Sequence, residues 1–87
     1  MKIKIFWQDN CPNCPKVKEL GKQLEKEFTV QYFDVNSVDG LAEASYYNVM
    51  STPSVVVADN GDNELKTWRG MAPFLEEIKE GVMKIED

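Results

Sequence analysis

The sequence predicts a single α/β domain over residues 1–87, with the element order βαβαββα. Three observations lead to this prediction. An alternating apolar segment lies near the N-terminus, an amphipathic segment follows it, and a pair of β-rich segments flanks a turn before the last amphipathic segment. A helix between the first two strands makes them parallel, and the hairpin adds antiparallel neighbours. We therefore expect a four-stranded mixed sheet with helices on both faces.

The first strand is predicted over residues 2–7, where lysine and isoleucine alternate before two aromatic residues. Phe6 is expected in the core. From residue 12 to about residue 28 the apolar residues lie three or four positions apart, which indicates an amphipathic helix. Pro12 and Pro15 are expected in its first turn, where a missing N–H is tolerated.

A second strand is predicted over residues 29–35, which are rich in β-branched and aromatic side chains. The weaker helical pattern of residues 39–48 follows, and either Ser37 or Asp39 is expected to cap it. Its narrow apolar stripe is expected to consist of Leu41, Ala44 and Tyr47.

Two further strands are predicted at residues 54–58 and 64–69, joined by the turn residues 59–63, so that together they form a hairpin that Gly70 closes. Pro73 is expected in the first turn of the last helix. The apolar face of that helix is expected to consist of Phe74, Leu75, Ile78, Val82 and Ile85.

The overall charge argues against two classes of partner. The chain carries ten basic and fifteen acidic residues, which give a net charge of −5. This balance lacks the positive surface that nucleic acids and anionic membranes attract. The apolar runs are far shorter than the ~20 residues of a membrane span. The N-terminus enters the first strand without the apolar region of a secretory signal, so we expect a cytoplasmic protein.

Both cysteines of the chain lie in the motif Cys11-Pro12-Asn13-Cys14, between the first strand and the first helix. A helix N-terminus stabilises a thiolate and lowers the pKa of a cysteine there, whereas Asp9 opposes that shift by repulsion. We expect thiol–disulfide exchange, in which the exposed Cys11 attacks and the more buried Cys14 resolves the mixed disulfide.

A metal site and a structural disulfide are weaker interpretations of the same motif. A zinc site needs four ligands, and the chain has no histidine and no further cysteine. A disulfide ring this small removes little entropy from the unfolded chain, so it stabilises the fold weakly. We therefore expect no metal and no bound cofactor.

The motif and the Thr52-Pro53 pair before the hairpin resemble the thioredoxin superfold in its minimal, glutaredoxin-sized form, over essentially the whole chain. The resemblance implies that the Thr52–Pro53 bond is cis and faces the disulfide. It also implies that the Thr52 backbone pairs with an extended substrate segment. The substrate-binding residues implied in this way are Trp7, Pro12, Asn13, Met50, Thr52, Pro53, Gly70 and Met71.

Within this superfamily, the favoured function is that of a monomeric protein disulfide reductase, which carries electrons to client protein disulfides. A thioredoxin-reductase-like flavoenzyme is the expected electron donor. Residues 68–73 resemble the Trp-x-Gly-x-x-Pro segment of the glutaredoxin-like redoxins that serve ribonucleotide reductase, so that enzyme is one expected client.

Two alternatives stay open. The first is a glutathione-dependent glutaredoxin, but that family usually has an aromatic residue at the place of Asn13, a basic residue before the first cysteine, and an acidic residue after a Gly-Gly pair. Asp9 lies where the basic residue is expected, and Met71 and Ala72 follow Gly70, so the charges that bind glutathione are lacking. The second is a non-catalytic binding module with the same fold.

Overall fold

The computed structural model describes residues 1–86 and contains a four-stranded sheet in the order β2-β1-β3-β4. β1 runs parallel to β2 and antiparallel to β3, and β3 runs antiparallel to β4. The predicted α/β class, element order and mixed sheet are confirmed, while position 87 of the predicted domain lies outside the described residues. The strands are β1 (Lys2–Trp7), β2 (Thr29–Asp34), β3 (Ser54–Ala58) and β4 (Glu64–Trp68), and the helices are α1 (Cys14–Leu24), α2 (Val38–Tyr46) and α3 (Leu75–Glu86).

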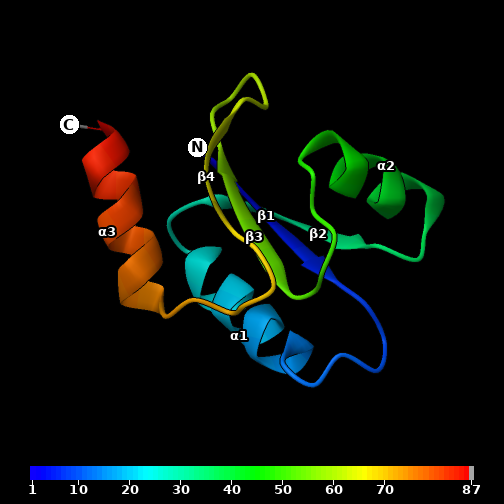
Figure 1. Ribbon diagram of the computed structural model, residues 1–87. Helices are drawn as coiled ribbons and strands as arrows, with labels where there is room; N and C mark the ends of the chain where they lie inside the picture. The colour runs from blue at the N-terminus through cyan, green and yellow to red at the C-terminus, as the bar shows by residue number, and fades with distance from the viewer. Residues whose placement is uncertain (87) are drawn as a thin grey trace.

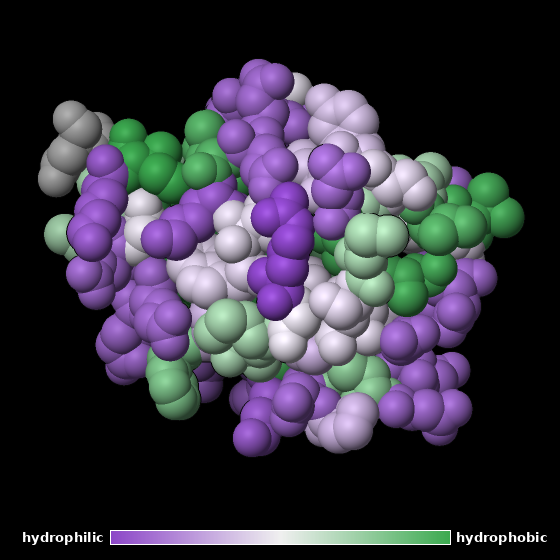
Figure 2. Space-filling view, viewed as in Figure 1, coloured by the Kyte–Doolittle hydropathy of each residue, from purple (hydrophilic) through white to green (hydrophobic). Residues whose placement is uncertain are grey.

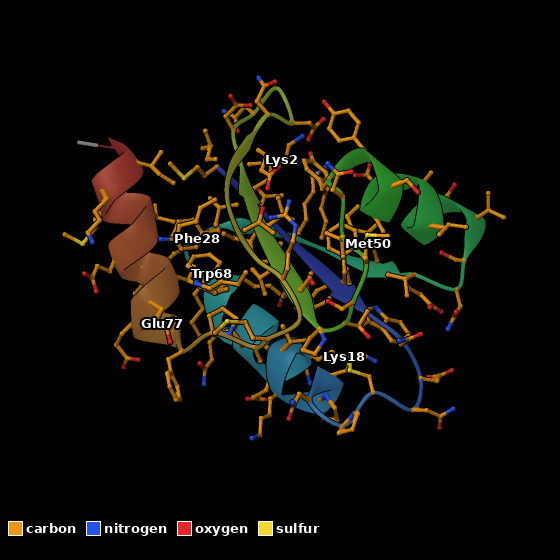
Figure 3. All side chains as sticks on the ribbon, in the orientation of Figure 1. Lys2, Lys18, Phe28, Met50, Trp68 and Glu77 are labelled. Atoms are coloured by element: carbon orange, nitrogen blue, oxygen red, sulfur yellow. A yellow bond between two sulfur atoms is a disulfide. The ribbon has the colours of Figure 1, made fainter. Side chains whose placement is uncertain are left out.

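Helices cover both faces of the sheet, as the sequence predicts. Figure 1 shows α2 on one side of the sheet and α3 on the other, with α1 on the same side as α3. The larger core lies between the sheet and these two helices, and Figure 3 shows Phe28 and Trp68 in the layer between the sheet and α3. Its fully buried members include Ile3, Ile5 and Ile78.

A smaller core lies between the sheet and α2. Phe6 is fully buried there, as expected, and its ring stacks on that of Phe33 at a centroid distance of 5.3 Å. Ala44, Tyr47, Val49 and Val56 complete this cluster. Since the side chains of a strand alternate between the two faces, Phe6 belongs to this core while Ile5 belongs to the other one.

The structure corrects the predicted start of the first helix and the predicted apolar stripe of the second. α1 begins at Cys14 with Asn13 as its N-cap, so Pro12 precedes the helix and only Pro15 lies in its first turn. In α2, Leu41 is exposed rather than buried. Gly40 faces the sheet so closely that a Cβ there would collide with the carbonyl oxygen of Asp34, and Leu41, about 100° further around the helix, therefore points away.

The predicted start of the last helix is also wrong. The carbonyl oxygen of Phe74 accepts hydrogen bonds from the N–H groups of Glu77 and Ile78, which places Phe74 before the first residue of α3. Pro73 therefore lies outside the first turn. Phe74 does not join the apolar face, because a residue at the cap has left the helical path, and its side chain is 74% exposed.

A buried charge lies on the face of the sheet that α2 covers. The Lys4 side chain is only 3% exposed, and its Nζ lies 3.2 Å from both a Glu43 and an Asp62 carboxylate oxygen. The same Nζ lies 4.9 Å from the centre of the Tyr47 ring. Lys2 reaches Asp62 at 2.9 Å. This Lys4 cluster joins β1, α2 and the β3–β4 turn.

The contacts within the Lys4 cluster shift the pKa values of Lys4 and Asp62. Burial lowers the pKa of Lys4, but its polar contacts with Tyr47, Glu43 and Asp62 outweigh burial, so the pKa is raised above its ordinary value of 10.5. The hydrogen bonds from Lys2 and Lys4 hold the pKa of Asp62 below its ordinary value of 3.8. Charged Lys4 and charged Asp62 therefore both stabilise the folded chain at pH values between 3.8 and 10.5.

We predict that Lys4→Met lowers the free energy of unfolding at neutral pH by about 1–3 kcal/mol, because it leaves the Glu43 carboxylate without its buried partner. Chemical denaturation measures the change. Lys22→Met, a lysine exposed on α1, is the matched control and should leave stability within about 0.5 kcal/mol.

The difference between the wild type and Lys4→Met should depend on pH. The folded chain lowers the pKa of Asp62, so the contribution of that group is present above pH 3.8 and is lost as the pH falls through its lower folded value. Unfolding curves should therefore converge in acid. A difference that stays constant down to about pH 2 would show that the Asp62 carboxylate does not take part.

Candidate active site

Three loops meet at one end of the sheet, and the strand directions bring them there. β1 leads into the cysteine motif, whereas β3 runs antiparallel to β1 and begins directly after Pro53. β4 runs antiparallel to β3, so its end and the following Gly70 lie at the same edge. The sheet topology therefore gathers the cysteine motif, the Thr52–Pro53 loop and the Gly70 loop.

Cys11 and Cys14 form a disulfide with a Cα–Cα distance of 5.3 Å. The two cysteines differ in exposure, because Cys14 lies in the first turn of α1 and is 3% exposed, whereas Cys11 lies before the helix and is half-buried. Pro12 and Asn13 between them are both exposed. A reaction partner can therefore approach Cys11 more easily than Cys14.

The start of α1 is suited to hold a negative charge. Its N-cap, Asn13, makes no side-chain capping hydrogen bond, and its first turn contains no acidic residue. The positive end of the helix dipole is therefore not neutralised by its N-cap or by an acidic residue of its first turn. A thiolate at Cys11, three residues before the helix begins, would face this end and would be stabilised by it.

Trp7, one of the implied substrate-binding residues, is half-buried at the end of β1, and its ring contacts a cation. Lys18 Nζ lies 3.5 Å from the centre of the indole ring, close enough for a cation–π contact. Figure 3 marks Lys18 on α1. Trp7 therefore links the end of β1 to α1, and one face of its ring is covered.

The Thr52–Pro53 peptide bond is cis, and Pro53 is buried. Gln8, directly after β1, donates a hydrogen bond from Nε2 to Thr52 Oγ1 at 2.8 Å. Within residues 1–86, the backbone N–H and C=O groups of Thr52 take part in no backbone hydrogen bond. These two groups are therefore available to another chain.

A buried serine connects the Thr52–Pro53 loop to the Gly70 loop. Ser54 is fully buried, and its Oγ donates to the Ser51 carbonyl at 2.7 Å and accepts from the Gly70 N–H at 3.1 Å. Gly70 has a φ of +72°, and a Cβ there would lie 2.9 Å from Ser51 Oγ. Both its conformation and its close approach to Ser51 therefore favour glycine.

A pocket of about 500 Å³ lies on the α2 side of the Thr52–Pro53 loop, with Gln8 and Thr52 among its lining residues. Met50 lines it as well and is 95% exposed. In Figure 2, hydrophobic surface gathers over α2, where Val38 and Leu41 are exposed. Met71, at 42% exposure, follows Gly70 on the third loop.

Sequence reasoning missed two residues of this site, Gln8 and Ser54. Gln8 directly follows β1 and Ser54 begins β3, and their roles depend on which strands are neighbours rather than on a local motif. Within the part of the chain that the structure describes, no three His, Cys, Asp or Glu side chains lie close enough together to hold a metal ion. In the same part, no helix is long and apolar enough to cross a membrane.

Comparison with known proteins gives consistent matches. A family model for the thioredoxin domain matches residues 1–83. A probable thioredoxin of Archaeoglobus fulgidus is 32% identical over 59 residues, which are 66% of this chain and 65% of that protein, so the match spans just under two thirds of the relative.

Solved thioredoxin structures share the fold. Thioredoxin 1 of Thermosipho africanus superposes with a TM-score of 0.70 at 21% identity, covering 99% of this chain and 94% of that one. A mutant thioredoxin of Halobacterium salinarum gives 0.82 at 19% identity, covering 99% and 74%. The fold and the adjacent Cys11–Cys14 pair support thiol–disulfide oxidoreductase chemistry. With a domain model matched over residues 1–83, the chain belongs to the thioredoxin family.

Proposed function

We propose that this protein reduces disulfide bonds of other proteins. The observation that carries the proposal is the asymmetric Cys11–Cys14 disulfide at the start of α1, in which Cys11 is half-buried and Cys14 is buried. Exchange requires an accessible thiolate that attacks the client disulfide, and a second thiol nearby can then resolve the mixed disulfide. Cys11 and Cys14 fit these two roles.

In the reduced protein, the Cys11 thiolate attacks one sulfur of a client disulfide. A mixed disulfide forms between Cys11 and the client, and the other client sulfur leaves as a thiolate. Cys14 then loses its proton and attacks the Cys11 sulfur, which releases the second client thiolate and forms the Cys11–Cys14 disulfide. Two electrons pass to the client, whose two thiolates take up the protons at neutral pH.

Docking would use the loops around the disulfide. The unpaired N–H and C=O groups of Thr52 suit an extended client segment that adds as a short strand. Met50 and Met71 offer flexible apolar contacts that fit many protein surfaces. Trp7, Pro12, Asn13 and Pro53 remain candidate members of this client-binding surface.

To act repeatedly, the oxidised protein needs a donor of two electrons. A thioredoxin-reductase-like flavoenzyme is our proposed donor, and ribonucleotide reductase is one proposed client. The monomeric state and the cytoplasmic location stay predictions. Glutathione is the less favoured donor because Asp9 is exposed two residues before Cys11, and Arg69, beside Gly70, donates to the Tyr47 and Asn48 carbonyls.

We expect the wild type to accelerate the reduction of insulin by a dithiol, measured as turbidity. Cys11→Ser should abolish this activity, because the attacking thiolate is lost. Pre-reduced Cys14→Ser, mixed with insulin in the absence of the dithiol, should instead accumulate a mixed disulfide with the client, which mass spectrometry of the acid-quenched reaction detects. A wild type without turnover would contradict the proposal and favour a non-catalytic binding module.

The two cysteines should also differ in their reactivity toward iodoacetamide. In the reduced protein at neutral pH, Cys11 should be alkylated at least about tenfold faster than Cys14, because only Cys11 is accessible before the helix. Peptide mapping after timed quenching gives both rates. Equal rates would show that the attacking and resolving roles are assigned wrongly.

The choice of donor can be tested with a charge reversal. We expect slow turnover of a small glutathione mixed disulfide by the wild type, because Asp9 repels the glutathione carboxylates. Asp9→Lys should raise this rate by about twofold to fivefold, and Asp39→Lys on α2 is the charge-matched control. Fast turnover by the wild type would make the protein a glutaredoxin.

A further inference from the structure

The hydrogen-bonded pairing of β1 and β3 stops just before the Thr52–Pro53 loop. Its last pair joins Phe6 and Ser54. Continued in the same antiparallel register, the next pairs would set Trp7 opposite Pro53 and Gln8 opposite Thr52. The Trp7 carbonyl accepts from the Val35 N–H and so faces β2, and Thr52 makes no backbone hydrogen bond with Gln8 within residues 1–86. The loop therefore begins without the backbone bonds that hold β3.

A side-chain hydrogen bond joins the two segments where the backbone hydrogen bonds between β1 and β3 end. Gln8 Nε2 donates to Thr52 Oγ1 at 2.8 Å, and the contact is partly buried. These are the two residues that the continued register sets opposite each other. Within residues 1–86, no other side-chain hydrogen bond joins the segment after β1 to the segment before β3.

The opposite side of the loop is held by Ser54, through its bonds to the Ser51 carbonyl and the Gly70 N–H. Ser51 and Thr52 are thus tethered from two directions by side chains. The tethers leave the backbone N–H and C=O of Thr52 unpaired within the described residues. Such an arrangement orders the backbone of the loop without using up its hydrogen-bonding groups.

We propose that Gln8 is a positioning residue, which holds Thr52 so that its free backbone groups meet an extended segment of a client protein. The inference rests on the proposed function, since it concerns how that function selects polypeptide substrates. A backbone that is already ordered loses less entropy when a strand adds to it. A small disulfide has no peptide segment to pair with Thr52, so the ordered loop backbone does not improve its binding.

The first experiment compares Gln8→Ala with the wild type on two substrates. For insulin, we expect KM to rise about fivefold while kcat changes less than twofold, which corresponds to the loss of about one hydrogen bond. For dithiobis-nitrobenzoate, a small aromatic disulfide, we expect kcat/KM to stay within about twofold. Gln23→Ala, an exposed glutamine on α1, is the control and should match the wild type on both.

The partner of Gln8 is tested from the other side of the bond. Thr52→Val removes the hydroxyl and should reproduce the rise in KM, whereas Thr52→Ser keeps the hydroxyl and should restore most of the affinity. The double variant Gln8→Ala/Thr52→Val should be no worse than either single variant. Fully additive effects would overturn the proposal, and so would a Gln8→Ala variant with unchanged KM for insulin or an equal loss on the small disulfide.

A measurement independent of activity completes the test. Backbone order parameters from NMR should fall at Ser51 and Thr52 in Gln8→Ala and stay unchanged in Gln23→Ala. Unchanged order parameters in Gln8→Ala would overturn the positioning role whatever the kinetics show. If the wild type fails to reduce insulin, the proposed function fails, and the order parameters still decide whether Gln8 positions Thr52.

Discussion

The antiparallel pairing of β1 with β3 is the constraint on which the candidate active site depends. It brings the chain that leaves β1 and the chain that enters β3 to the same edge of the sheet, although Cys11 and Pro53 are far apart in sequence. The pairing must also stop there, because a ladder that continued through Thr52 would occupy the groups that a client segment needs. Within the described residues, Thr52 makes no backbone hydrogen bond, although the continued register would pair it with Gln8. Side-chain hydrogen bonds of Gln8 and Ser54 hold the Thr52–Pro53 loop in place of these backbone hydrogen bonds.

The position of α2 depends on polar contacts at its C-terminal end and on the face that it turns to the sheet. At its C-terminal end, the Arg69 guanidinium donates to the Tyr47 carbonyl at 2.8 Å, which links the end of α2 to the end of β4. On the face toward the sheet, Glu43 and Tyr47 contact Lys4 in the Lys4 cluster. A short helix with few buried residues gains little from packing alone. These polar contacts therefore fix the α2 wall of the pocket beside Thr52.

Local patterns in the sequence predicted the strands, the order of elements and the cysteine motif, because periodicity and short motifs report on neighbours along the chain. They could not predict that Lys4 is buried, since its partners come from α2 and from the β3–β4 turn. The exposure of Leu41 depends on the close approach of Gly40 to β2, and the start of α3 depends on Phe74 as a cap. The role of Gln8 likewise requires knowledge of the strand register.

The arrangement of charges around the disulfide bears on the kind of substrate. Arg69 is the basic residue beside the Gly70 loop, and its donors are directed to the end of α2 and to Glu64. Lys18 is directed to the Trp7 ring. A small anionic substrate would have to compete for these cations, whereas a polypeptide can use the Thr52 backbone and the apolar surface of Met50 without disturbing them. Recognition through backbone groups is indifferent to side-chain sequence, so this arrangement supports our proposal that the site serves many protein clients.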